Sequence, residues 1–299
     1  MNYRHHYHAG NFADVFKHAA LVQLVRALQR KDKGFLYLDT HSGRGTYDLL
    51  GAARGLTLDR APEWPEGVGR LLDADPATLS PALRDYLQIV RAHDAKRRAE
   101  TAGTEDVAGA SVRHYPGSPR FVQNLVRPQD RLVLCELHPD ESALLADEFR
   151  DARRVRVESV DGYAAIKAHL PPLERRALVL IDPPFEAGDE FARVAESIDE
   201  ALRRLPSAII AIWYPLTERA RSDTFLDELA DYGPPPTCAI ELTIAGPDSP
   251  QKMRGCGLIV INPPWQLAPV LADLAADLAT RLAQTSGGGS ALRWIAPEA

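Results

Sequence analysis

Seven short apolar runs along the chain predict the strands of a sheet. Most of these runs are continuously apolar rather than alternating, which is typical of strands buried on both faces. The runs are Phe35–Asp39, Arg131–Glu136, Val155–Ser159, Ala177–Asp182, Ala208–Trp213, Cys238–Ile244 and Gly257–Asn262.

Segments with helical periodicity separate many of these runs. Phe12–Gln29 has apolar residues at positions 12, 15, 16, 19 and 22, and Asn11 is suited to cap its N-terminus. Four further segments predict helices, namely Asp140–Arg150, Gly162–His169, Glu190–Arg204 and Ser222–Tyr232. Strands and helices that alternate over this length predict an α/β fold with a parallel, doubly wound sheet.

Residues 46–113 interrupt this alternation. They show no strand pattern, are rich in Ala, Leu, Arg and Asp, and contain several prolines. We therefore expect a helical subdomain here, inserted after the first strand of a main domain that comprises residues 1–45 and 114–299. Near the C-terminus, Ser286–Ser290 predicts a flexible link, and Ala291–Pro297 predicts an edge strand.

The composition is that of an ordinary globular protein. Of 299 residues, 45% are hydrophobic and 25% are charged, which is enough apolar material for a full core and argues against wholesale disorder. The net charge of −6 means that any surface for nucleic acid is local rather than general. No apolar stretch reaches the roughly 18 residues of a membrane span, and the N-terminus lacks the apolar core of a secretion signal. We expect a cytoplasmic protein.

The three cysteines form no CxxC pair. Cys135 lies in an apolar run and Cys256 lies next to one, so buried thiols in a reducing compartment are expected. A metal site built on cysteine is not expected.

Polar residues follow several predicted strands and are candidates for ligand binding. The loop Leu38–Gly45 contains two glycines, which suit either a close approach to a ligand or a plain strand-to-helix turn. Glu136 could accept hydrogen bonds from ribose hydroxyls, or it could stabilise the start of the next helix. Asp161 and Gly162 could meet an adenine amino group, or they could merely begin a helix.

The most specific motif is Asp182-Pro183-Pro184-Phe185, directly after a strand. The prolines fix the backbone and have no N–H, so the Asp182 side chain and a proline carbonyl can together accept both hydrogens of an exocyclic amino group. The ring of Phe185 can stack on the base that carries this group. A turn that contains two prolines by chance is the alternative.

A second motif of the same form occurs at Asn262-Pro263-Pro264-Trp265. Ligands in doubly wound sheets bind where the strand order reverses, among the central strands. The Asn262 strand is the seventh along the chain and is expected nearer an edge. We therefore favour Asp182.

The N-terminal run Tyr3–His8 combines cations, imidazoles and aromatic rings, which suit phosphates and stacked bases. A metal-binding histidine cluster and a solvated tail are the alternatives. Lys17 and His18 follow on the first predicted helix, where an i,i+4 pair with Asp14 is the simplest role for His18.

Taken together, these motifs resemble class I S-adenosylmethionine methyltransferases that act on an amino nitrogen. A closer resemblance covers nearly the whole chain, to the ribosomal large-subunit RNA methyltransferase J family. It rests on YRHHYHAGNFADVFKH, FLYLDTHSGRG, YPGSP, ELHPDE, VDGY, LIDPPFE, IWYPL and VINPPW. The aromatic residue after the two prolines is often tyrosine in the family, and Phe185 keeps the stacking ring without the hydroxyl.

The resemblance implies roles for individual residues. Asp182 would be the catalytic acceptor, and Pro183, Phe185 and Tyr3 would contact the substrate. The S-adenosylmethionine site would be lined by His18, His41, Ser118, Glu136, Asp161, Gly162 and Asp182. The inserted helical subdomain would contribute to RNA binding, and no metal would be required.

The implied function is methylation of N6 of one adenine in 23S rRNA, on protein-free or early-assembly RNA, by a cytoplasmic monomer that binds no membrane. Methylation of DNA adenine or of a protein glutamine uses related sites and stays an alternative. A non-catalytic nucleic-acid-binding protein could also keep the fold. The missing GxGxxG motif argues against a third alternative, a dehydrogenase.

Overall fold

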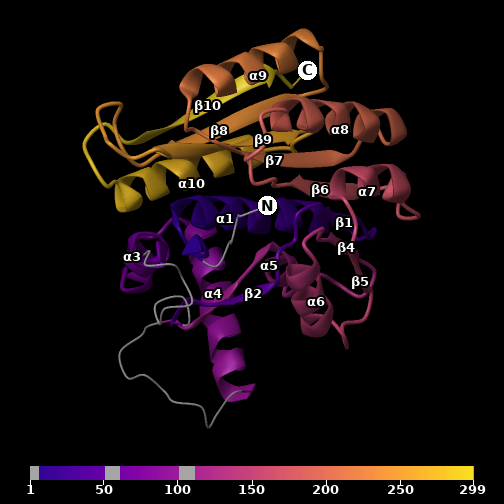
Figure 1. Ribbon diagram of the computed structural model, residues 1–299, viewed down its shortest axis with the longest axis horizontal. Coiled ribbons are helices and arrows are strands. Elements are labelled where there is room, and N and C mark those ends of the chain that lie inside the picture. Colours follow the sequence, from indigo (N-terminus) through magenta and orange to yellow (C-terminus); the bar gives the residue numbers. More distant parts are fainter. Residues whose placement is uncertain (1–6, 51–60, 101–111, 299) are drawn as a thin grey trace.

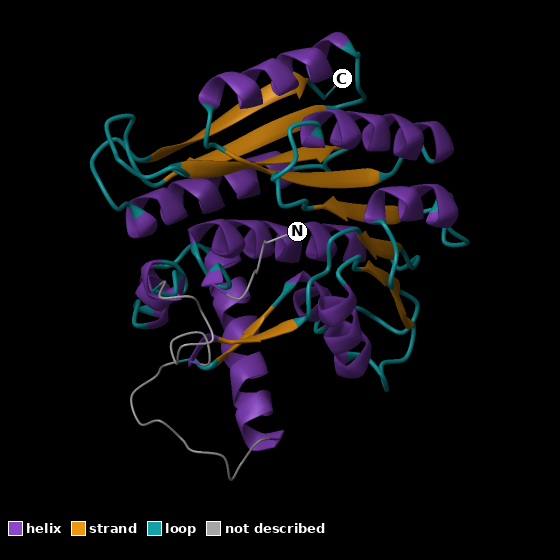
Figure 2. Cartoon of the chain, viewed as in Figure 1, coloured by secondary structure: helices purple, strands orange, loops and turns teal. Residues whose placement is uncertain are grey.

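The computed structural model describes residues 7–50, 61–100 and 112–298, and an eight-stranded sheet runs through it (Figures 1 and 2). The strand order is β10-β8-β9-β7-β6-β1-β4-β5. The strands are β1 Leu36–Asp39, β4 Arg131–Cys135, β5 Val155–Glu158, β6 Ala177–Ile181, β7 Ile209–Pro215, β8 Thr237–Thr243, β9 Gly255–Ile261 and β10 Gly289–Ala296. All seven predicted strands are confirmed, and the α/β fold class with them.

The sheet is parallel in only part of its width. Strands β5, β4, β1, β6 and β7 are parallel, whereas β9 is antiparallel to both β7 and β8, and β10 is antiparallel to β8. A parallel crossover needs a dozen or more residues, usually with a helix. Residues 244–254 between β8 and β9 form no helix and are too few, so β9 must return in the opposite direction.

Helices cover both faces of the sheet (Figure 1). One apolar cluster packs α1 (Phe12–Gln29), α5 (Ser118–Gln123), α6 (Pro139–Glu148) and α10 (Leu267–Leu282) against one face. The other cluster packs helices α7, α8 and α9 against the opposite face; they span Gly162–His169, Glu190–Arg204 and Arg219–Asp231. Consecutive residues of β1 belong to different clusters, as expected for a strand buried on both sides.

The predicted helices agree closely with the observed ones. The bounds of α1, α7 and α8 match the prediction, and those of α6 and α9 differ by one to three residues. Asn11 caps α1 as expected, because its side-chain oxygen accepts a hydrogen bond from Asp14 N at 2.9 Å. Helices α5 and α10 were not indicated by the pattern analysis.

The proposed insertion is helical in its described part (Figure 1). It contains η2 (Trp64–Glu66), α3 (Gly69–Leu72), η3 (Pro76–Thr78) and α4 (Pro81–Glu100). Two short strands that the pattern did not predict, β2 (Thr46–Asp48) and β3 (His114–Pro116), pair at its two ends. Side chains of α4 and α1 share one apolar cluster, so the insertion packs onto the main domain rather than standing apart. We keep residues 46–113 as the extent of the proposed subdomain, because β2 lies at its start and β3 follows its end.

The C-terminal edge strand is confirmed, but it begins inside the expected link. Gly289 and Ser290 already pair with Thr243 and Leu242 of β8, so the end of that glycine-rich segment is part of the sheet. In the described part of the chain, no helix combines the length and the apolar character needed to cross a membrane.

Candidate active site

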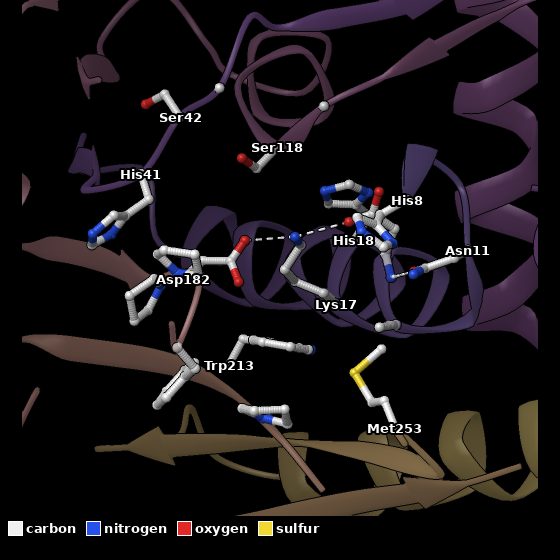
Figure 3. A pocket seen from close by; sticks show the side chains of 18 of the residues that line it. His8, Asn11, Lys17, His18, His41, Ser42, Ser118, Asp182, Trp213 and Met253 are labelled. Atoms are coloured by element: carbon white, nitrogen blue, oxygen red, sulfur yellow. Dashed lines mark hydrogen bonds and ion pairs between the residues drawn. The ribbon is translucent and has the colours of Figure 1, made fainter. Parts of the chain in front are cut away.

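A cavity of about 1100 Å³ lies at the carboxyl ends of the parallel strands (Figure 3). Loops after β1, β4, β5 and β6, the end of β7 and the first turns of α1 contribute to its walls. The strand order reverses at β1, between β4 and β6, so the cavity lies where doubly wound sheets bind ligands. The structure brings nine of the predicted site residues to this cavity: His18, His41, Ser118, Glu136, Asp161, Gly162, Asp182, Pro183 and Phe185. The tenth, Tyr3, lies outside the described residues.

Asp182 shares a buried cation with a second carboxylate. Lys17 Nζ lies 2.6 Å from Asp182 Oδ2 and 2.9 Å from Asp14 Oδ1 (Figure 3). Burial alone would lower the pKa of Lys17, but the two carboxylates outweigh burial and hold this pKa well above its ordinary value. Lys17 therefore stays charged, and Asp182 faces the cavity as a hydrogen-bond acceptor.

Phe185, which follows the two prolines, has a strained backbone conformation. Phe185 has a φ of 51°, in the left-handed region that a bulky side chain rarely adopts. Its ring centroid lies 4.8 Å from that of Phe191 and 6.0 Å from that of Trp213. This aromatic packing fixes the turn after β6 and holds the ring at the cavity wall.

The competing motif at Asn262 lies at the other end of the strands, away from the cavity. Because β9 runs antiparallel to β7, its carboxyl end lies at the amino end of β7. Asn262 Nδ2 there donates to the carbonyls of Pro206 (2.9 Å) and Ala208 (2.8 Å). The strand order agrees with the expectation that this strand lies nearer an edge than the Asp182 strand, since two strands lie outside β9 and three lie outside β6. Strand direction, rather than rank in the sheet, separates Asn262 from the cavity.

The carboxylate of Glu136 is fixed by two backbone amides. Gly43 N donates to Oε2 and His138 N donates to Oε1, each at 2.8 Å. Gly43 has a φ of 60°, and a Cβ on it would lie 2.3 Å from the Tyr47 hydroxyl, so the first turn of this loop requires glycine. Glu136 thus holds the loop after β1 by a hydrogen bond, and its carboxylate still presents free lone pairs to the cavity.

The Thr40 hydroxyl holds the imidazole ring of His41. The Thr40 hydroxyl donates to the Leu180 carbonyl at 2.9 Å, and His41 Nδ1 lies 2.8 Å from the same hydroxyl oxygen. When the hydroxyl donates to Leu180, Nδ1 carries the proton and Nε2 is an acceptor. Burial lowers the pKa of His41 to about 4, despite the nearby carboxylates of Asp182 and Asp161. The ring is neutral at pH 7.

Asp161 and Gly162 both have local structural roles. Asp161 caps α7 by accepting a hydrogen bond from Tyr163 N at 3.0 Å, and it pairs with Arg193 at 2.8 Å. A Cβ on Gly162 would lie 1.9 Å from the Thr40 carbonyl oxygen. The absence of a side chain here lets α7 approach the loop after β1.

Ser118 and His18 are held by buried partners. The Ser118 and Tyr37 hydroxyls both donate to Asp39 Oδ2 at 2.7 Å. Burial raises the pKa of Asp39 to about 6, although these two hydrogen bonds oppose the rise. His18 Nδ1 lies 2.9 Å from the Tyr115 hydroxyl, which comes from the same Tyr115–Pro119 motif as Ser118.

Several cavity residues were not singled out from the sequence. Trp213, Met253 and Arg193 line the cavity, and the contact between Lys17 and Asp182 was not predicted. The signal for Lys17 was a lysine and an aspartate three residues apart among apolar residues at the start of a helix. For Trp213 it was an aromatic residue at the end of the predicted strand Ala208–Trp213.

The expectation that the cysteine thiols are buried is confirmed. Cys135, Cys238 and Cys256 are all free thiols and buried. Among the described residues, no group of three or more His, Cys, Asp or Glu side chains could hold a metal ion.

Comparison with known proteins covers nearly the entire chain. The family model described as "Ribosomal RNA large subunit methyltransferase D, RlmJ" matches residues 32–296. Ribosomal RNA large subunit methyltransferase J of Escherichia coli is 38% identical and that of Haemophilus influenzae 37%, over the full length of both chains. The crystal structure of protein LPL1258 from Legionella pneumophila superposes with a TM-score of 0.80 at 33% identity, covering 96% of this chain and 97% of that one. The chain therefore belongs to the RlmJ family of ribosomal RNA large subunit methyltransferases, which are S-adenosylmethionine-dependent transferases.

Proposed function

We propose that this enzyme methylates N6 of one adenine of 23S rRNA, with the target base swung out of its stack into the cavity. The observation that carries the proposal is the pairing of Asp182 with the charged Lys17 at the point where the strand order reverses. This pairing holds the Asp182 side chain, a hydrogen-bond acceptor, beside a proline carbonyl that has no neighbouring N–H to occupy it.

The proposed chemistry depends on how the amino group is held. The N6 lone pair of adenine is delocalised into the ring, so this nitrogen is a poor nucleophile. Hydrogen bonds from both amino hydrogens to the Asp182 carboxylate and the Pro183 carbonyl favour a pyramidal, more nucleophilic nitrogen. Positioning of this kind can contribute about 7–11 kcal/mol to a reaction between two bound groups.

The other end of the cavity fits S-adenosylmethionine. Its residues offer acceptors for the donors of that molecule, namely the fixed carboxylate of Glu136, neutral His41 and Asp161. Buried His138 Nδ1 has no hydrogen-bond partner within the described residues, which is typical of a site that awaits a ligand. Together with His18, Ser118 and Gly162, these residues would hold the cofactor. When bound, S-adenosylmethionine supplies a methyl group activated on a cationic sulfonium.

Phe185 would stack on the target base, and Tyr3 would contact the RNA, the latter on family resemblance alone. Swinging a base out of its stack costs a few kcal/mol, and less in a loop or flexible stem. We therefore propose protein-free or early-assembly 23S rRNA as the substrate. The proposal places the reaction in the cytoplasm, assigns RNA contacts to the insertion, and has the enzyme act as a monomer without a metal.

Incubation with methyl-labelled S-adenosylmethionine and protein-free 23S rRNA tests this function. We expect label in the RNA, recovered as N6-methyladenosine after digestion to nucleosides. An adenine-containing DNA duplex and a glutamine-containing peptide are the parallel arms for the two alternative substrates. Label in either of these but not in RNA would reject the proposal, and so would label in RNA at another nucleoside.

A further inference from the structure

Four polar residues form a closed network of side-chain and backbone contacts at the Asp161 end of the cavity, between α7 and α8. Arg193 Nη2 lies 2.8 Å from Asp161 Oδ2, and Arg193 Nη1 lies 3.8 Å from Glu190 Oε1. The Tyr163 hydroxyl donates to the same Glu190 oxygen at 2.6 Å, and Tyr163 N donates to Asp161 Oδ1 at 3.0 Å. All four residues line the cavity.

This network holds the Asp161 carboxylate from two directions. The amide at the start of α7 fixes Oδ1, and the guanidinium from α8 fixes Oδ2. With both oxygens held, the carboxylate cannot rotate about its Cβ–Cγ bond without losing a hydrogen bond. Each oxygen still has a free lone pair, so a third donor can reach the carboxylate from the cavity.

Arg193 is itself held in place. Its guanidinium carbon lies 4.4 Å from the centroid of the Tyr163 ring, a cation–π contact. The Tyr163 ring in turn meets the His41 ring edge-on, with centroids 5.1 Å apart. The planar guanidinium can stack and donate at the same time, which a lysine ammonium cannot reproduce.

We propose that Arg193 is a positioning residue that fixes Asp161 as an acceptor for the 6-amino group of the cofactor's purine, so that the site selects a 6-aminopurine over a 6-oxopurine. This inference rests on the proposed binding of S-adenosylmethionine at this end of the cavity. A fixed carboxylate attracts an amino group and repels a keto oxygen. A carboxylate free to turn away would relax that repulsion and also lose the hydrogen bond.

Calorimetry with two ligands that differ at the purine 6-position, and in the proton that the 6-oxo form carries on N1, tests the proposal. S-adenosylhomocysteine carries the amino group, and S-inosylhomocysteine carries a keto oxygen instead. We expect the wild type to bind the adenosine form at least about tenfold more tightly, as for a hydrogen bond to a charged group. Arg193→Met is expected to weaken that ligand about tenfold and the inosine form less than about twofold. The affinity of Arg193→Lys for S-adenosylhomocysteine is expected to lie between those of the wild type and Arg193→Met.

Arg221→Met is the matched control. Arg221 also lies over an aromatic ring, at 5.7 Å from the Phe191 centroid, but it is not among the residues that line the cavity. The control is expected to keep wild-type discrimination. In the methylation assay, Arg193→Met is expected to raise the KM for S-adenosylmethionine about tenfold with kcat within about twofold of the wild type, because Arg193 acts through Asp161.

Four results would overturn the inference. Equal weakening of both ligands by Arg193→Met would give Arg193 a merely structural role, and so would an unchanged ratio with a lowered melting temperature. A wild type that binds both ligands equally would remove Asp161 as the amino-group acceptor, while leaving the methyltransferase function intact. A wild type that binds neither ligand would instead reject the proposed cofactor site.

Discussion

Lys17 Nζ lies 2.6 Å from Asp182 Oδ2, a contact that joins the first helix of the chain to the turn after β6. The same ammonium lies 2.9 Å from Asp14 Oδ1, so one buried cation serves two carboxylates. The residue that we propose as the acceptor for the target amino group is therefore positioned by a helix 165 residues away in sequence. This relationship makes the start of α1 part of the active site rather than a support for the sheet.

Asp182→Ala is expected to reduce methyl transfer at least about a thousandfold, because one of the two acceptors for the amino group is lost. The variant should stay folded, since Lys17 keeps its pair with Asp14. Turnover with labelled cofactor measures the effect, and circular dichroism checks the fold. The control Asn262→Ala should keep most activity and lose about 1–2 kcal/mol of stability, because its amide bonds two carbonyls. Near-normal turnover of Asp182→Ala would remove Asp182 from the chemistry.

Lys17→Met is expected to lower the free energy of unfolding by about 3 kcal/mol, because the buried carboxylate of Asp14 and the partly buried carboxylate of Asp182 lose their common counter-charge. Urea unfolding at pH 7 measures this change. The double variant Asp14→Asn with Lys17→Met should recover part of the loss, since only one carboxylate then lacks a partner. A single variant as stable as the wild type would contradict the shared pairing.

Glu136→Ala is expected to weaken the rise in melting temperature that S-adenosylmethionine produces without RNA, because a ligand that binds only the native state stabilises it more when it binds more tightly. The substitution also frees the amides of Gly43 and His138. The melting temperature without ligand should therefore fall as well, and the ligand-induced shift must be compared within each protein. Equal shifts in the two proteins would remove Glu136 from the cofactor site.

His41 is expected to make stability depend on pH between about 6.5 and about 4. Burial lowers its pKa to about 4 in the folded state, whereas the unfolded chain takes up a proton near 6.5. The contribution is fully present above about 6.5 and is lost as the pH falls towards 4. Unfolding measured at pH 7.0 and 4.5 should show a smaller loss for His41→Asn than for the wild type. An identical loss in both proteins would show that His41 titrates normally.

Short-range sequence pattern is enough to predict several parts of the fold. Continuous apolar runs identified seven strands, and helical periodicity with an N-cap at Asn11 identified α1 to the residue. Glu136, Asp161 and Asp182 could be chosen as site candidates because each follows a strand, and the carboxyl ends of parallel strands meet at one edge of a sheet.

Tertiary structure alone decided the direction of the last strands and the partners of the charged groups. An apolar run buries equally well in either direction, so its pattern could not show that β9 is antiparallel and carries Asn262 away from the cavity. The Lys17–Asp182 and Arg193–Asp161 pairs likewise join residues far apart in sequence. Their charges could each have been solvated at a surface. Only the packing of α1 and α8 around the strand ends excludes water from Lys17 and turns both cations toward carboxylates.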